Sequence, residues 1–147
     1  MTNTVVDILL VEDREEDAEL AMIALAEHQL ANNIKWVKDG QEALDFLLAE
    51  GEYTDRNGSA RPKVVLLDLK MPKVDGIAVL QTIRSTPRLA SLPVVVLTTS
   101  KQEQDIIKAY ELHVNSYIVK PVDFEQFSQS VKELGMYWLL VNEAPPK

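Results

Sequence analysis

The chain has 147 residues, of which 46% are hydrophobic and 26% charged, as is usual for one globular domain with a buried core. Its formal net charge of −8 at pH 7 argues against a general binder of nucleic acids or anionic membranes, because such proteins need basic patches. The absence of cysteine excludes disulfides, thiolate catalysis and cysteine-based zinc sites, and two histidines offer little for a histidine-rich metal site.

The sequence shows no targeting signal. Its first residues, Met1-Thr2-Asn3-Thr4, lack the basic and apolar regions of a signal peptide. No apolar run approaches the roughly 20 residues that a membrane-spanning helix needs. We therefore expect a soluble cytoplasmic protein.

The first half of the chain alternates between strand and helix patterns. Residues 5–11 are a predicted strand that ends in the acidic pair Glu12-Asp13. Residues 15–28 are a predicted helix, because small and apolar residues recur at helical spacing in them. A strand at 34–37 and a helix at 41–50 follow. Residues 51–62 are polar and rich in turn formers, so we interpret them as a long exposed loop within one domain.

The second half contains two continuous apolar runs that indicate central strands. Residues 63–68 and 94–97 are rich in β-branched side chains and are predicted strands buried on both faces. Between them, residues 77–85 are a predicted helix. The remaining predicted elements are a helix at 102–112, a strand at 115–119 and a last helix at about 123–140.

Five strands alternating with five helices predict an α/β fold with a parallel five-stranded sheet and helices on both of its faces. We expect the flavodoxin-like (βα)5 arrangement, in which the strand order is 2-1-3-4-5. Residues 5–140 would form this domain, and residues 141–147 a C-terminal tail. In such a sheet the C-terminal ends of the strands share one edge, where ligands bind.

Reactive side chains follow the predicted strands at this edge. Aspartate is disfavoured inside a strand, so Asp68 should stand at the C-terminal end of its apolar run. The candidate site consists of Glu12 and Asp13 after the first strand, Asp68 after the third, Thr98 and Thr99 after the fourth, and Lys120 after the fifth.

This set of side chains has a chemical logic. Clustered carboxylates repel one another unless a cation joins them, and an oxygen-only donor set suits Mg²⁺. A metal ion and the Lys120 ammonium beside one carboxylate would neutralise the charge on a phosphoryl group during its transfer. The hydroxyl of Thr98 and the backbone N–H of Thr99 could bind a phosphoryl oxygen. Asp68 is then the predicted nucleophile, which forms an acyl phosphate.

The chain resembles the receiver domain of two-component response regulators over about residues 5 to 140. The motifs that carry the resemblance are Leu10-Val11-Glu12-Asp13, Leu67-Asp68-Leu69-Lys70-Met71-Pro72, Asp75-Gly76, residues 93–98, and Lys120-Pro121. The resemblance implies that Asp68 is the phosphoacceptor and that a histidine kinase supplies the phosphoryl group. The receiver would catalyse only its own phosphorylation and dephosphorylation.

The resemblance also implies roles for the surrounding residues. Asp13 would hold Mg²⁺ directly and Glu12 through water, with the backbone carbonyl of Lys70 as a further ligand. Lys120 would pair with the phosphoryl group, and the peptide before Pro121 would be cis. Implied switch residues are the hydroxyl of Thr98 and the aromatic ring of Tyr117.

Three features depart from a minimal receiver: the long 51–62 segment, Thr99 in place of a small residue, and the apolar run at 136–141. With the sequence at 96–100, they resemble the small single-domain regulators of bacterial and cyanobacterial phytochrome kinases. This implies a phytochrome-type kinase as partner. The run that contains Trp138 could simply cover the core, but we favour a homodimer surface in the C-terminal helix region.

The same residues are compatible with more ordinary roles and with two further functions. Each acidic residue, taken singly, could be a turn former or a helix cap. A phosphatase that forms an aspartyl-phosphate is a second hypothesis, although Lys70 stands where haloacid-dehalogenase-like phosphatases carry a second Asp. A pseudo-receiver that only binds partners is a third, and the complete acidic set argues against it.

Overall fold

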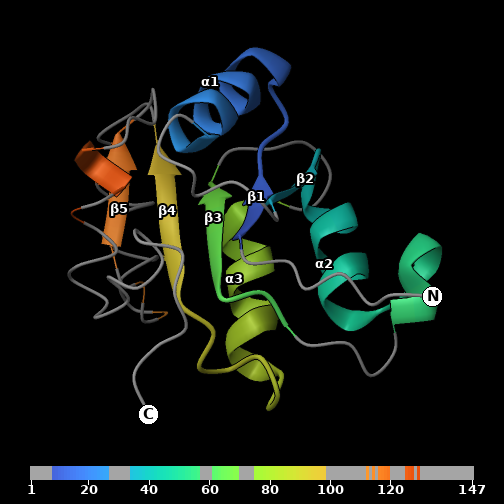
Figure 1. Cartoon of the computed structure of the whole chain (residues 1–147). Helices are drawn as coiled ribbons and strands as arrows, with labels where there is room; N and C mark the ends of the chain where they lie inside the picture. Colours follow the sequence, from blue (N-terminus) through green and yellow to red (C-terminus); the bar gives the residue numbers. More distant parts are fainter. Residues whose placement is uncertain are drawn as a thin grey trace, which may run out of the picture.

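A computed structural model describes residues 8–26, 34–56, 61–69, 75–98, 112, 114, 116–119, 125–127 and 129. Five strands in these residues form a parallel sheet in the order β2-β1-β3-β4-β5 (Figure 1). The strands are β1 (Ile8–Val11), β2 (Ile34–Val37), β3 (Val64–Asp68), β4 (Val94–Thr98) and β5 (Ser116–Val119). The predicted strand order is confirmed.

The register of the ladders sets which strand ends lie level. Val11 pairs with Val37 of β2 on one side and with Leu67 of β3 on the other. The residue after Val11 therefore lies level with Asp68, the last residue of β3. Asp68 in turn pairs with Leu97, so β4 ends one residue further on, at Thr98. The sheet thus brings the ends of β1, β3 and β4 to one edge.

The described residues include three α-helices of nine residues or more: α1 (Glu15–Ala26), α2 (Gly40–Leu48) and α3 (Gly76–Ser85). Aspartate side chains cap two of them, as expected for helix N-termini. Asp39 accepts a hydrogen bond of 2.8 Å from the Glu42 N–H, and Asp75 accepts one of 2.9 Å from the Ala78 N–H. Both helices therefore begin one residue before the positions predicted from sequence. None of the helices in the described ranges is long and apolar enough to cross a membrane.

The core is divided between the two faces of the sheet. Alternate strand residues such as Leu9 and Val65 pack with α2 and α3, whereas Ile8 and Leu66 pack with α1. Strands buried on both faces explain the continuous apolar runs in the sequence. The positions of α2 and α3 on one face and α1 on the other confirm the prediction of helices on both faces of the sheet. The helix predicted at 123–140 is described only for one turn around Phe127, which packs on the α1 side, and residues 102–111 lie outside the described ranges.

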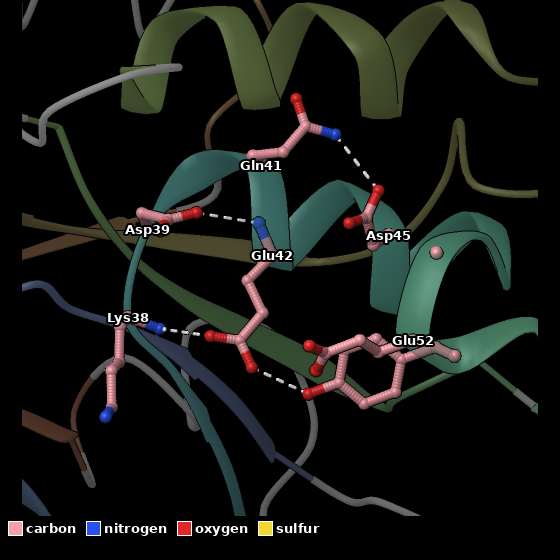
Figure 2. Close-up of a pocket in the computed structure, with 8 residues that line it drawn as sticks. Lys38, Asp39, Gln41, Glu42, Asp45 and Glu52 are labelled. Atoms are coloured by element: carbon pink, nitrogen blue, oxygen red, sulfur yellow. Dashed lines mark hydrogen bonds between the residues drawn. The ribbon is translucent and has the colours of Figure 1, made fainter.

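The segment after α2 differs from the exposed loop predicted at 51–62. Its first half is a 3-10 helix, η1 (Gly51–Arg56), that packs on α2. The Tyr53 ring meets the Phe46 ring edge-on, with centroids 5.2 Å apart. Its hydroxyl donates a hydrogen bond of 2.7 Å to Glu42, whose other carboxylate oxygen accepts one from the Lys38 N–H (Figure 2). An aromatic residue in a polar segment thus anchors η1 beside an open pocket of about 470 Å³.

Arg84 ties the C-terminal part of α3 to the segments before β4 and β5. Its guanidinium donates hydrogen bonds of 2.7 Å to the carbonyls of Leu92 and Leu112, and one of 3.1 Å to that of Ala90. Burial lowers the pKa of Arg84 below its usual value. These hydrogen bonds tie the chain segments that lead into β4 and β5 to the C-terminal end of α3.

Candidate metal and phosphoacceptor site

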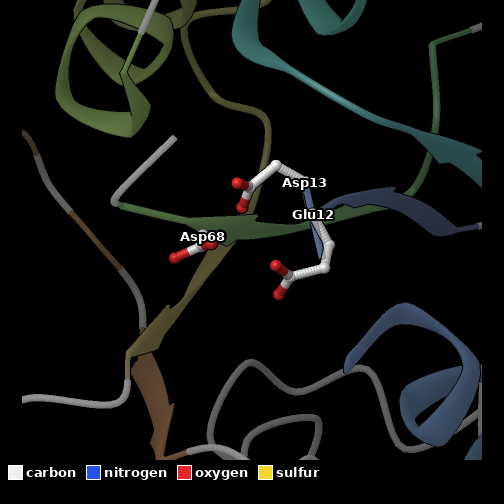
Figure 3. Close-up of side chains that lie close together, drawn as sticks. All are labelled: Glu12, Asp13 and Asp68. Carbon is white, nitrogen blue, oxygen red and sulfur yellow. The ribbon is translucent and has the colours of Figure 1, made fainter. Parts of the chain in front are cut away.

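Three carboxylates meet at the C-terminal edge of the sheet. Glu12 and Asp13 follow β1, and Asp68 ends β3. One oxygen from each lies within 4.8 Å of the oxygens of the other two, and Figure 3 shows the three side chains gathered at the ends of their strands. Glu12 is 1% exposed and Asp68 is 5% exposed. Three acidic groups so close together, two of them buried, need cationic or hydrogen-bonding compensation.

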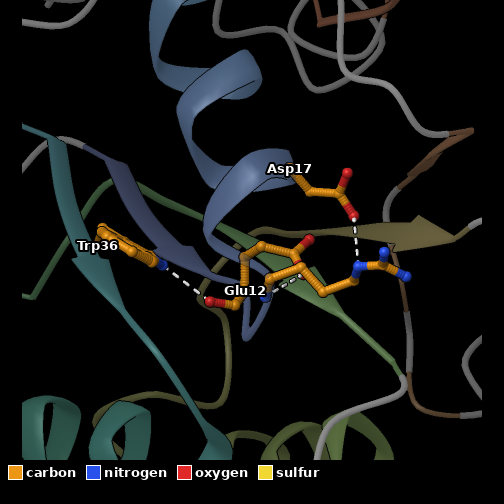
Figure 4. A network of polar contacts seen from close by, with 4 residues as sticks. Glu12, Asp17 and Trp36 are labelled. Atoms are coloured by element: carbon orange, nitrogen blue, oxygen red, sulfur yellow. Dashed lines mark hydrogen bonds and ion pairs between the residues drawn. The ribbon is translucent and has the colours of Figure 1, made fainter.

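The backbone and side chain of Glu12 are held at three points. Its N–H donates a hydrogen bond of 3.1 Å to the carbonyl of Val37 on β2. Its own carbonyl accepts one of 2.8 Å from the Trp36 indole (Figure 4). One of its carboxylate oxygens accepts a hydrogen bond of 3.1 Å from the backbone N–H of Arg14, which immediately precedes α1. The position of the acidic pair therefore depends on β2 as well as on β1.

Asp13 supplies the observation that best fits a cation. Its Oδ1 atom is buried and has no hydrogen-bond partner among the described residues. A buried carboxylate oxygen is costly unless a donor or a cation compensates it. The other members of the cluster also offer only oxygen, the donor type preferred by hard divalent cations such as Mg²⁺ and Mn²⁺. These residues therefore fit a divalent metal.

Gly76, the first residue of α3, lies against the backbone at the end of β3. A Cβ built on it would lie 2.4 Å from the Asp68 carbonyl oxygen and 2.5 Å from the Leu69 Cα. Its N–H donates a hydrogen bond of 2.9 Å to the Leu69 carbonyl. Only glycine allows this approach, which brings the start of α3 against the end of β3 next to Asp68.

We expect Gly76→Ala to lower the free energy of unfolding by about 2–3 kcal/mol, because its methyl group overlaps backbone that cannot swing away. If the acidic cluster holds a divalent cation such as Mg²⁺, the substitution should also weaken its binding, since Asp68 must shift. Gly51→Ala is the matched control: it is strained by a φ of +55° and meets the flexible carboxylate of Asp45, so it should destabilise without changing metal affinity. Urea unfolding and calorimetric Mg²⁺ titration measure both effects. Wild-type stability and affinity in Gly76→Ala would contradict the expectation.

The structure describes only part of the predicted site. Glu12, Asp13 and Asp68 are brought together as expected. Thr98 ends β4 and Tyr117 lies in β5, but their side chains lie outside the described part of the chain. The remaining predicted site residues, Lys70, Thr99, Lys120 and Pro121, also lie outside it. Sequence reasoning missed the contact from Trp36, although a tryptophan in the strand beside the acidic pair was a usable signal.

Comparison with known proteins places the chain in a family. Residues 8–132, most of the chain, match the family described as the response regulator receiver domain. The chain is a member of this receiver family. The resemblance to receiver domains seen in the sequence is confirmed. Membership in the receiver family favours a role in two-component signalling over the phosphatase considered as a second hypothesis.

Relatives at high identity cover nearly the whole receiver. The "Probable methanogenesis regulatory protein FilR2" of Methanothrix harundinacea (strain 6Ac) is 47% identical over 139 residues, which is 94% of this chain and 86% of the relative. The structure of the bacteriophytochrome response regulator AtBRR is 50% identical, with a TM-score of 0.84, and covers 96% of this chain and 100% of its own.

Two further solved structures carry information about ligands. The phosphorylated cyanobacterial phytochrome response regulator RcpA is 42% identical, with a TM-score of 0.75, over 98% of this chain and 100% of that one. The Mn²⁺-bound form of response regulator Rcp1, a protein of Synechocystis, is 40% identical, with a TM-score of 0.74, over 96% of this chain and 99% of that one. This receiver therefore resembles one protein solved with a divalent metal and another solved in a phosphorylated state.

Proposed function

We propose that this receiver is a phosphorylation switch in which Asp68 accepts a phosphoryl group from a partner histidine kinase. The observation that carries the proposal is the buried cluster of Glu12, Asp13 and Asp68 at the C-terminal edge of the sheet of a receiver-family fold. An oxygen of the Asp68 carboxylate forms a bond to phosphorus as the phosphorus–nitrogen bond of a phosphohistidine breaks. The product is an acyl phosphate on Asp68.

Glu12, Asp13 and Asp68 would hold the metal, with Glu12 acting through water and the Lys70 carbonyl as a fourth group. We propose Mg²⁺, because it prefers oxygen ligands and keeps several waters. When bound, the metal neutralises negative charge on the phosphoryl oxygens. The unpartnered Oδ1 of Asp13 and the Mn²⁺ bound by a relative support a divalent cation here.

Other residues would bind the phosphoryl group and transmit its presence. Lys120, before a cis peptide at Pro121, would pair with one phosphoryl oxygen, and the Thr98 hydroxyl and Thr99 N–H would bind another. Movement of Thr98 would let the Tyr117 ring turn inward. This would bias a two-state surface around β5 and its neighbouring helices, so the output is a changed protein contact.

The names of the relatives suggest partners. AtBRR and RcpA are phytochrome response regulators, which supports a phytochrome-type kinase for this receiver. The relative FilR2, by contrast, is named as a probable methanogenesis regulatory protein. We further propose a cytoplasmic receiver domain at residues 5–140 that forms a homodimer through its C-terminal helix region and catalyses only its own phosphorylation and dephosphorylation.

Acetyl phosphate and Mg²⁺ provide the direct test. Intact-mass spectrometry should show the gain of one phosphoryl group, on a bond that is stable in acid and labile in base. Chelation of the metal before the donor is added should prevent the gain. No adduct, or an adduct that forms equally well with EDTA present, would contradict the proposal, and steady turnover of a small phosphate ester would instead support a phosphatase.

A further inference from the structure

Trp36 reaches the acidic cluster from a strand that contributes no carboxylate to it. In the ladder, Trp36 pairs with Leu10, yet its indole Nε1 donates a hydrogen bond of 2.8 Å to the carbonyl of Glu12, two residues after Leu10 and just past the end of β1 (Figure 4). The bond is therefore additional to the ladder. It crosses from the edge strand to the chain segment that leaves the sheet.

This bond acts on the peptide that joins Glu12 to Asp13. The carbonyl that accepts it belongs to that peptide, and the Glu12 N–H on the other side is bonded to Val37 at 3.1 Å. β2 thus fixes Glu12 on both sides of its Cα. Because the plane of a peptide sets the direction in which the next residue leaves, the indole also fixes Asp13.

We propose that Trp36 is a positioning residue for the metal site, whose indole N–H holds the Glu12–Asp13 peptide so that both carboxylates face one cation. The proposal rests on the proposed function, because it takes Glu12, Asp13 and Asp68 as the metal-binding set. Hydrogen bonds that orient metal ligands commonly change metal affinity by about 10- to 100-fold when they are lost. Without the indole bond, cation binding must order a freer peptide, which reduces affinity.

A structural role alone makes a different prediction. The indole N–H of a half-buried tryptophan usually finds an acceptor, and the Trp36 ring also packs against the core on the α1 side. If Trp36 only stabilised the fold, its replacement would lower the unfolding free energy. The affinity of the folded protein for a metal would stay the same. Metal affinity measured on folded protein therefore separates the two roles.

The test compares variants that lose one aromatic hydrogen bond each. Trp36→Phe keeps a ring but removes the donor, and its Kd for Mg²⁺ by calorimetry should rise about tenfold, or ~1.4 kcal/mol. The matched control, Tyr53→Phe, removes the 2.7 Å hydrogen bond to Glu42 beside α2 and should leave this Kd unchanged. Replacing Trp36 with β-(3-benzothienyl)alanine, which keeps the shape and exchanges the N–H for sulfur, should weaken binding as Trp36→Phe does.

A spectroscopic readout tests the same bond directly. In ¹⁵N-labelled wild-type protein, the indole N–H resonance that disappears in Trp36→Phe should shift on addition of Mg²⁺. The shift should saturate with the midpoint found by calorimetry. A resonance that does not respond to saturating Mg²⁺ would argue that the peptide held by Trp36 is not part of the metal site.

The outcomes separate this proposal from the one on which it rests. If wild-type protein binds Mg²⁺ and both Trp36 variants bind it as tightly as wild type does, the positioning role is overturned and the proposed function stands. If wild-type protein binds no Mg²⁺, the proposed function fails and the positioning role falls with it. Should Trp36→Phe not fold, the benzothienyl protein decides the question, because it preserves the packing.

Discussion

Asp68→Asn is expected to take up no phosphoryl group from acetyl phosphate with Mg²⁺, under conditions that modify the wild-type protein fully. An amide is not a nucleophile that can form a stable acyl phosphate, so the loss should be complete. The substitution keeps the size of the side chain, and Asp68 is 5% exposed at the end of a strand, so the fold should persist. Intact-mass spectrometry reads the adduct, and circular dichroism checks the fold.

Asp75→Asn is the matched control for this loss of one carboxylate. Asp75 is exposed and caps α3, a position at which asparagine serves as well as aspartate. This variant should be modified as fully as wild type. A stoichiometric adduct on Asp68→Asn would show that another carboxylate is the acceptor, and an Asp75→Asn protein that resists modification would show that the assay reports something other than Asp68.

The fold was predictable where one pattern determined one element. Residues 64–67 and 94–97 are continuous, β-branched-rich apolar runs, and a strand covered on both faces buries every residue of such a run. In α1, the helical spacing of Ala18, Ala21 and Leu25 was equally direct, and all three are buried. The alternation of such elements then leaves few topologies, because parallel crossovers are right-handed.

Features that depend on contacts between distant segments were not predictable in the same way. The 51–62 segment is polar, which favoured a loop, yet its first half is a 3-10 helix in which the partly buried Tyr53 ring packs edge-on against Phe46. The composition of a segment hides the effect of one such residue, whereas the packing of the segment depends strongly on it. The clustering of Glu12, Asp13 and Asp68 was predictable, because parallel strands end on one edge. The close approach of Gly76 to the Asp68 backbone could be seen only once the three-dimensional course of the chain was known.

Asp13→Asn is expected to be more stable than wild type without metal and less stable than wild type at saturating metal. In EDTA the variant should be more stable, because three carboxylates within 4.8 Å of one another repel at a cost of about 1–2 kcal/mol after solvent screening and other partners are allowed for. Its Mg²⁺ affinity should fall by about 100-fold, since a charged ligand with a buried, unpartnered oxygen becomes a neutral one.

Saturating metal should therefore favour the wild-type protein. Mg²⁺ at about 100 times the wild-type Kd should add roughly 2.7 kcal/mol to wild-type stability, and much less to that of Asp13→Asn. Urea unfolding in EDTA and in Mg²⁺ measures the crossing. Glu19→Gln makes the same change of net charge at an exposed position on α1 and should follow wild type in both conditions. A variant less stable than wild type in EDTA would mean that hydrogen bonds already compensate the cluster, and the carboxylates would then need no cation to coexist.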